Sequence, residues 1–222
     1  MTSEESARRR TPTRLTSALG CRLRAGMREY DLIADWYASD RVDTTDGGGV
    51  SEVMALASSI RVGGRVLDIG CGSGQPLTRA LLASGHRIVG LDSASNMLRR
   101  FRANCPDTPA VKAVVQACPF AADVFDAAIA WGVMFHLKQA EQMLAIASVS
   151  RVLRPGSPFL FTAGDVDDDS GDHVGVMNGV EFHYYSFSID RYRSVLGDHR
   201  FTLVDLHRDS GTNLYYLAQK TA

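Results

Sequence analysis

A ten-residue stretch, residues 65–74, constrains the fold of this chain more than any other. It reads Arg-Val-Leu-Asp-Ile-Gly-Cys-Gly-Ser-Gly, so an apolar run with β-branched residues passes into a loop with glycine at every second position. The run predicts a buried strand, and the apolar spacing of residues 77–81 after Pro76 predicts a helix that ends before Gly85. Strand, glycine-rich turn and helix form the opening unit of a nucleotide-binding α/β sheet. Glycines here let the backbone approach a ligand closely, because they carry no Cβ.

The spacing of the glycines narrows the choice of ligand. A dinucleotide fingerprint reads G-x-G-x-x-G or A, whereas here Gln75 stands where the third small residue belongs. No Lys-Ser or Lys-Thr pair follows, which excludes a triphosphate P-loop. Asp68 adds a carboxylate at the end of the strand. Because a lone buried carboxylate is costly, we expect it to have a cationic or hydrogen-bonding partner.

This combination resembles motif I of the class I S-adenosylmethionine (SAM) methyltransferases, whose ligand carries an ammonium group and no phosphate. The matching residues are Asp68, Gly70, Cys71, Gly72 and Gly74. The resemblance extends over about residues 29–220. It implies an α/β fold with a doubly wound, Rossmann-like sheet of seven mostly parallel strands, the last antiparallel, and helices on both faces. It also implies SAM as the cofactor and S-adenosylhomocysteine as the product.

The length of 222 residues fits one domain, and 45% hydrophobic residues suffice for a substantial core. Residues 1–28 hold seven arginines against two glutamates, a net charge of +5, so the remainder carries −6 of the total of −1. We expect 1–28 to be a disordered basic tail; a start at Met27, a transit peptide or a nucleic-acid arm are the alternatives. The rest is expected to be one methyltransferase domain, with cap helices at 29–60, a SAM-binding core at 61–164, an acidic and aromatic lid at 165–187, and a last helix with an antiparallel strand pair at 188–222.

Four cysteines without CxxC spacing are typical of reduced thiols in a cytoplasmic protein. No apolar run is long enough for a membrane helix, and no signal peptide is visible. The acidic loop 165–173 matches the first positions of an EF-hand, but Ser170 replaces the required glycine and Val176 the bidentate glutamate. We therefore expect a solvated loop and no metal.

Residues 29–40 predict an amphipathic helix with its apolar face on Tyr30, Ile33, Ala34 and Tyr37. Such a helix can simply cap the sheet. The resemblance implies that it lies over the cofactor, where Tyr37 and Arg41 would meet the methionine carboxylate.

Asp92 ends a second predicted strand, residues 87–92, at 22 residues after Gly70. An acidic residue at about this distance accepts hydrogen bonds from both ribose hydroxyls; an N-cap aspartate is the alternative. The resemblance places Ser93 and Met97 at the adenine edge, although Met97 could equally be core. The family often has a serine two residues after the acidic residue, but this chain has Ala94 there, so Ser93 or Ser95 must cap the next helix.

A third strand is predicted at 110–115. The family has an acidic residue shortly after it, but this chain has none at 114–116, so the adenine contact would pass to Gln116 and to the backbone around Ala117. The fourth strand, 125–132, resembles the family strand that faces the transferable methyl group. Trp131 would then contact the cofactor.

Residues 138–149 predict a helix, 151–156 the family's turn, and 157–162 the fifth strand. After it, an aromatic segment at 174–187 would form a lid over a flat substrate, unless it only packs. Ser188 is expected to cap a helix through Leu196, followed by antiparallel strands at 200–207 and 212–218. The expected substrate contacts are Phe135, His136, His183 and Tyr184.

Methyl transfer from a sulfonium needs a base only when the acceptor must lose a proton. His136 is the first candidate and His183 the second, because an unperturbed imidazole titrates near neutrality. We expect transfer to O, N or C of a small metabolite by in-line displacement. The alternatives are an RNA or protein methyltransferase and a non-catalytic SAM-binding protein. The acidic domain speaks against a nucleic-acid partner, no membrane partner is expected, and the sequence leaves the acceptor and the oligomeric state open.

Overall fold

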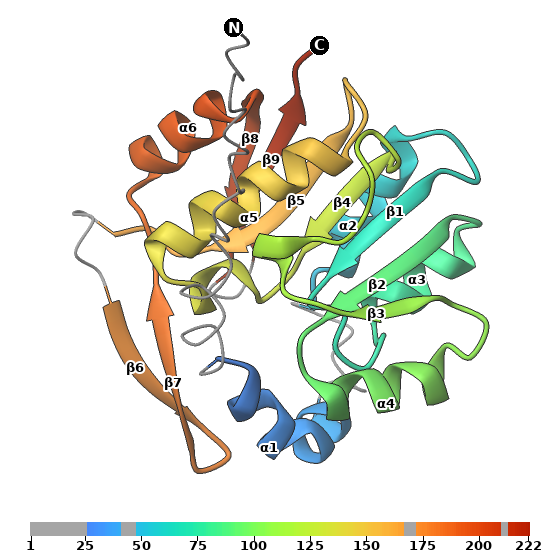
Figure 1. The fold of residues 1–222 in the computed structure, drawn as a ribbon, viewed down its shortest axis with the longest axis vertical. Coiled ribbons are helices and arrows are strands. Elements are labelled where there is room, and N and C mark those ends of the chain that lie inside the picture. Colours follow the sequence, from blue (N-terminus) through green and yellow to red (C-terminus); the bar gives the residue numbers. More distant parts are fainter. Residues whose placement is uncertain (1–25, 41–47, 167–171, 210–212) are drawn as a thin grey trace, which may run out of the picture.

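The computed structural model describes residues 26–40, 48–166, 172–209 and 213–222, and in this part of the chain seven strands form the main sheet (Figure 1). Their spatial order is β3-β2-β1-β4-β5-β9-β8. The strands are β1 (Arg65–Ile69), β2 (Arg87–Asp92), β3 (Ala110–Lys112), β4 (Ala127–Ala130), β5 (Pro158–Ala163), β8 (Phe201–Arg208) and β9 (Leu214–Lys220). Pairing from β3 to β5 is parallel, and β9 runs antiparallel to both β5 and β8. The predicted seven-stranded sheet with an antiparallel last strand is confirmed.

Helices cover both faces of this sheet. They are α1 (Gly26–Asp40), α2 (Val50–Ser59), α3 (Leu77–Ala83), α4 (Ser95–Asn104), α5 (Gln139–Val152) and α6 (Ile189–Asp198), with short 3-10 turns η1 (Val115–Ala117) and η2 (Met134–His136). Apolar residues of α5 and α6 form one core with Leu67 and Ile69 of β1. Residues of α2 and α3 form another with Val66, so the strand is buried on both sides, as its apolar sequence predicts. None of the helices described combines the length and apolar character needed to cross a bilayer.

Several predicted boundaries are wrong by a few residues. The third strand stops at Lys112 because its only ladder, with β2, ends there, and η1 occupies the positions expected to continue it. The fourth strand is limited to Ala127–Ala130, and the fifth is displaced by one residue. Helix α5 continues through Val152, so the first two residues of the expected turn 151–156 are helical.

A hairpin that the sequence analysis did not predict follows the main parallel strands. Strands β6 (Asp172–Met177) and β7 (Val180–Tyr185) pair antiparallel and make a separate two-stranded sheet, which Figure 1 shows standing away from the main one. Asn178 and Gly179 form its two-residue turn, with φ of 45° and 76°. Asn-Gly is the strongest short-range signal for such a turn, so the sequence did carry the information. Asp172 and His173 therefore belong to a strand, while residues 167–171 of the expected acidic loop lie outside the described residues.

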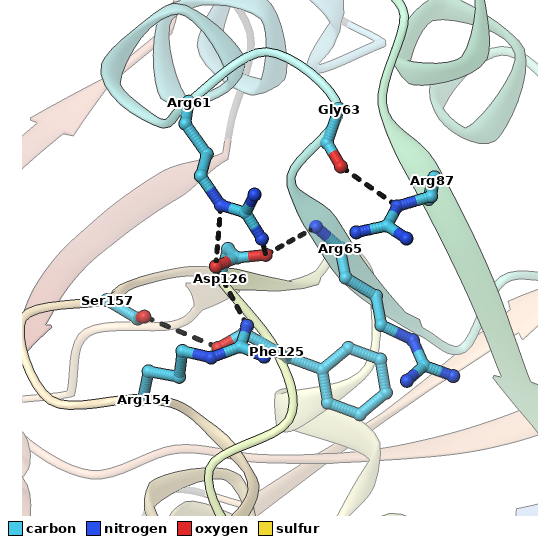
Figure 2. Close-up of polar contacts among 8 residues, drawn as sticks. All are labelled: Arg61, Gly63, Arg65, Arg87, Phe125, Asp126, Arg154 and Ser157. Atoms are coloured by element: carbon cyan, nitrogen blue, oxygen red, sulfur yellow. Dashed lines mark hydrogen bonds and ion pairs between the residues drawn. The ribbon is translucent and has the colours of Figure 1, made fainter.

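The amino edge of the sheet is held by Asp126, which precedes β4 (Figure 2). Its carboxylate accepts the backbone N–H of Arg65 at 2.7 Å and the guanidinium groups of Arg61 at 3.2 Å and Arg154 at 2.8 Å. Burial alone would raise the pKa of Asp126, but these donors outweigh it and the pKa is lowered. The cluster joins the turns before β1 and β5, and so fixes the sheet at the end opposite the glycine loop.

Candidate functional site

The glycine loop begins where β1 ends, at the carboxyl edge of the sheet. Gly70, Gly72 and Gly74 all have left-handed backbones, with φ of 67°, 53° and 82°. A Cβ on Gly70 would lie 2.2 Å from Val133 Cγ2, and one on Gly74 would lie 2.9 Å from Cys105 Sγ. At Gly70 and Gly74 the missing Cβ makes room for protein side chains, whatever ligand the loop binds. Only at Gly72 is the position of a Cβ free of close contacts.

A cleft opens at this loop, between α1, the end of β1 and the end of β4. Its lining consists of Tyr37, Gly48, Asp68, residues 70–78 and Trp131. The cleft thus brings together seven of the predicted cofactor residues, from α1, β1, the loop and the end of β4: Tyr37, Asp68, Gly70, Cys71, Gly72, Gly74 and Trp131. Six further lining residues were not predicted from the sequence: Gly48, Ser73, Gln75, Pro76, Leu77 and Thr78.

Asp68 is the charged group of the cleft. Its side chain is almost fully buried, and Thr78 Oγ1 of α3 donates a hydrogen bond to its Oδ2. Burial raises the pKa of Asp68 to about 7; the Thr78 hydrogen bond opposes this shift, and nearby Asp92 adds to it. The expected hydrogen-bonding partner is therefore present, and it is a neutral hydroxyl.

Asp92 ties the glycine loop to β2. Its Oδ2 accepts the backbone N–H of Gly72 at 2.9 Å, and its Oδ1 accepts that of Ala94 at 2.8 Å. Burial raises its pKa, and the backbone donors oppose the shift. A carboxylate has about four lone-pair sites, so the backbone donors Ala94, Gly72 and Ser93 leave Asp92 capacity for a further hydroxyl group of a ligand.

The N-terminus of α4 is capped from another helix. Asp31 Oδ1 of α1 accepts the backbone N–H of Asn96 at 2.7 Å, and the Asn96 side chain donates to the Asp31 carbonyl at 2.9 Å. The N-cap residue is Ala94, without a side-chain hydrogen bond. The expectation that Ser93 or Ser95 caps this helix is wrong, because a carboxylate supplied by α1 takes that place.

Five other predicted cofactor residues in the described part of the chain do not line the cleft, and Asp92 is one of them. Met97 is buried against Ala34 and the tyrosines of α1, which is the core alternative. Ser93 lies directly after Asp92, half-buried. In η1, Gln116 accepts a hydrogen bond from Ser148 through its carbonyl, and Ala117 is exposed. Arg41 lies outside the described residues.

His136 forms a hydrogen-bonded chain at the end of η2. Its Nδ1 lies 3.3 Å from the carbonyl oxygen of His183, and its Nε2 lies 2.9 Å from the hydroxyl of Tyr30. A carbonyl can only accept, so the proton is on Nδ1 and Nε2 accepts from Tyr30. Burial lowers the pKa of His136 to about 4, opposed by the His183 carbonyl. The imidazole is therefore neutral at physiological pH, and both of its nitrogens are occupied.

An aromatic cluster surrounds this histidine. The His136 ring lies within 4.8–5.6 Å of four others, measured between centroids, and these belong to Tyr30, Phe135, Phe182 and Tyr184. The structure thus assembles three of the four expected substrate contacts. His183 is different: its side chain is 54% exposed and lies 3.6 Å from Glu181, so only its backbone reaches the cluster. Tyr30 and Phe182 were missed as members, although the alternation along β7 places residue 182 on the same side as 184.

Trp131 forms a wall of the cleft. Its ring packs against Tyr215, with 5.0 Å between centroids, and a Cβ on Gly49 would lie 2.4 Å from Trp131 Cζ3. Gly49 also has a φ of 75°. No side chain fits at residue 49, so the segment before α2 lies directly against the indole.

The known proteins to which this chain is similar include several methyltransferases. A family model described as a methyltransferase domain matches residues 66–156. An uncharacterized methyltransferase of Synechocystis is 35% identical over 122 residues, which cover 54% of this chain and 57% of that protein. Squalene methyltransferase 1 of Botryococcus braunii is 32% identical over 58% of this chain and 36% of its own length. The chain therefore spans little more than half, or less, of these curated relatives.

Solved structures share the fold. The CcbJ methyltransferase of Streptomyces caelestis has a TM-score of 0.73 at 16% identity, covering 89% of this chain and 100% of the other. A 1,6-didemethyltoxoflavin-N1-methyltransferase of Burkholderia thailandensis, solved with its substrate and S-adenosylhomocysteine, has a TM-score of 0.67 at 21% identity and covers 88% of both chains.

Proposed function

We propose that this chain is a class I S-adenosylmethionine-dependent methyltransferase that transfers the SAM methyl group to O, N or C of a small-molecule acceptor. A methyltransferase-domain family model matches residues 66–156, and the fold is shared with solved methyltransferases. The observation that carries the proposal is the cleft at the carboxyl edge of the sheet, where a buried carboxylate and an open glycine meet. SAM supplies the electrophile, a methyl group on a positively charged sulfur. The residues present fit this cofactor, because Asp68 offers negative charge to its ammonium group.

Each end of the cofactor has a group suited to it. We assign Asp68 to the ammonium of the methionine part, and Tyr37 to the same end from α1. Asp92 would accept the ribose hydroxyls, while its existing bond to Gly72 holds the loop at the right distance. Trp131, rigid between Gly49 and Tyr215, would exclude water from the side of the cleft that faces the acceptor.

The acceptor would lie toward the aromatic cluster around His136. In-line displacement needs the nucleophile placed behind the methyl group, and rigid rings can hold a flat molecule in that position. Where the acceptor loses a proton, the lone pair on Nε2 of neutral His136 is the basic site, reached in place of the Tyr30 hydroxyl or through it. His183 then acts through its carbonyl, which keeps the proton of His136 on Nδ1.

A small acceptor is favoured over RNA or protein by the charge of the domain. Residues 29–222 carry a net charge of −6, the opposite of an electrostatic surface for nucleic acid. Among the relatives with printed activities, squalene methyltransferase 1 and (+)-O-methylkolavelool synthase are named for small molecules. A tRNA U34 carboxymethyltransferase is also similar, at 30% identity over 40% of its length, and keeps the RNA alternative testable.

The proposal is tested in two steps. Titration calorimetry should detect binding of SAM and S-adenosylhomocysteine but not of NAD, and binding should be lost in Asp92→Asn. Radiolabelled SAM is then incubated with separate panels of small aromatic and polar metabolites, total tRNA, and peptides. Label transfer to tRNA or peptide alone would contradict the assigned acceptor class, and SAM binding without transfer in any panel would favour a non-catalytic protein.

A further inference from the structure

Thr78 is the second residue of α3 and faces the charged group of the cleft. Its hydroxyl donates to Asp68 Oδ2, and the side chains of both residues are almost completely inaccessible, with 1% and 3% of their surfaces exposed. A hydroxyl placed in this way does two things for a carboxylate. It fixes the rotation of the group, and it stabilises the charged form against the neutral one.

Burial, the largest influence on the pKa of Asp68, acts in the opposite direction, and Asp92 on β2 adds a second carboxylate that acts in the same sense as burial. Gly90 and Ile129, its neighbours on β2 and β4, are neutral. None of the ion pairs found among the described residues includes Asp68. Thr78 is therefore the group that opposes burial.

We propose that Thr78 is a positioning residue for the cofactor: its hydroxyl aims the Asp68 carboxylate at the ligand's ammonium group and keeps that carboxylate ionised. This inference rests on the proposed function, because it assumes that SAM occupies the cleft. It predicts that SAM affinity depends on pH close to neutrality. With the pKa of Asp68 at about 7, affinity should fall about tenfold for each unit below that value.

The test compares wild type with Thr78→Val, which keeps the shape but removes the hydroxyl, and with Thr78→Ser, which restores it. SAM binding is measured by calorimetry between pH 5.5 and 7.5, below the range near 8 where an α-amino group itself titrates. In Thr78→Val the midpoint should move up by about one unit, which weakens SAM binding about tenfold at pH 6. Thr78→Ser should follow the wild-type curve.

Adenosine is the matched control ligand, since it has the ribose and base but no ammonium group. Its affinity should be the same in wild type and Thr78→Val at every pH, which also shows that the variant is folded. If Thr78→Val does not bind adenosine, Thr78→Ala takes its place. SAM curves that superimpose for wild type and the folded variant would overturn the inference, as would an equal loss for adenosine and SAM. Absence of SAM binding in wild type would instead refute the proposed function itself.

Discussion

The buried carboxylate of Asp68 lowers the stability of the folded protein, although it is suited to binding a cationic ligand. Its pKa is raised to about 7 by burial, against about 3.9 in an unfolded chain. Between these values the folded state binds more protons than the unfolded state, so stability falls as pH rises through this window. Above pH 7 the full penalty is present unless a cation enters the cleft, and the ammonium of SAM is such a cation.

Replacing Asp68 by Asn should therefore stabilise the ligand-free protein at high pH while removing SAM binding. The gain in unfolding free energy at pH 8 should reach at most about 4 kcal/mol, from three pKa units, and should shrink toward pH 4. Urea denaturation of both proteins at pH 5 and pH 8 measures it. A difference that is equal at both pH values would contradict a buried carboxylate as the source.

The protonation state of His136 gives a second prediction. Its pKa of about 4 lies below the unfolded value of 6.5, so the unfolded chain takes up a proton first, and stability is lost as pH falls from 6.5 toward 4. Nitrogen-15 NMR should show a neutral ring with the proton on Nδ1 at pH 6. In Tyr30→Phe the Nε2 signal should shift, because its donor is gone. A midpoint near 6.5 in the wild type would refute the buried arrangement.

Helix α1 supplies Tyr30 and Tyr37 to the site, and α4 is its main support. Asp31 caps α4 from inside the contact, whereas Asp35, one turn further, pairs with Arg100 at the surface. Both are aspartates of the same helix facing the same partner. They differ in burial: the Asp35 side chain is 76% exposed, so its ion pair should add little to stability.

This contrast predicts different effects of two similar substitutions. Asp31→Ala should lower the unfolding free energy by about 1 kcal/mol, the usual cost of a lost helix cap, and should weaken SAM binding because α1 also holds Tyr37 over the cleft. Asp31→Asn should retain most of the cap. Asp35→Ala is the control and should leave both properties nearly unchanged. Thermal unfolding and SAM calorimetry measure them, and equal effects from residues 31 and 35 would argue against the cap.

A helix or strand could be predicted from the sequence where the residues that determine it lie close together in the chain. Strands such as β1 and β2 are buried on both faces, so they appear in the sequence as apolar runs ending in Asp68 and Asp92. The β6–β7 hairpin was missed because one face is exposed: Val174 and Val176 point to solvent, and the apolar pattern is weak. Its Asn-Gly turn was the available signal.

Contacts between distant segments could not be predicted at all. Tyr30 and His136 are 106 positions apart, and no periodicity links them. The same holds for Asp31, which lies at the start of α4 and is 65 positions from Asn96. The glycines, in contrast, were correctly placed but incompletely explained, because a sequence cannot show whether a ligand or Val133 occupies the space a Cβ would need.

Across the whole molecule, the carboxylate that is paired with arginines and the two carboxylates near the cleft lie at opposite ends of the sheet. Asp126 and its arginines hold the amino edge (Figure 2), while Asp68 and Asp92 lie at the carboxyl edge, where open α/β sheets bind ligands. A carboxylate fully used by protein donors has no capacity left for a ligand. The two ends should therefore respond differently to substitution.

Asp126→Ala should lower the unfolding free energy by about 1 kcal/mol, because the Arg65 N–H and two exposed arginines lose their shared acceptor. The dissociation constant for SAM should change less than twofold at a temperature where the variant is folded. Urea denaturation measures the loss of stability, and calorimetry on the same preparations measures SAM affinity. A large loss of affinity in the folded variant would show that the two edges are coupled.

The β6–β7 hairpin shares no ladder with the main sheet, and β7 contributes Phe182 and Tyr184 to the aromatic cluster, where they contact Tyr30 of α1 and His136 of η2. If the acceptor binds at the aromatic cluster, as proposed, exchanging this hairpin for that of a relative should change which molecule is methylated and leave nucleoside binding unchanged.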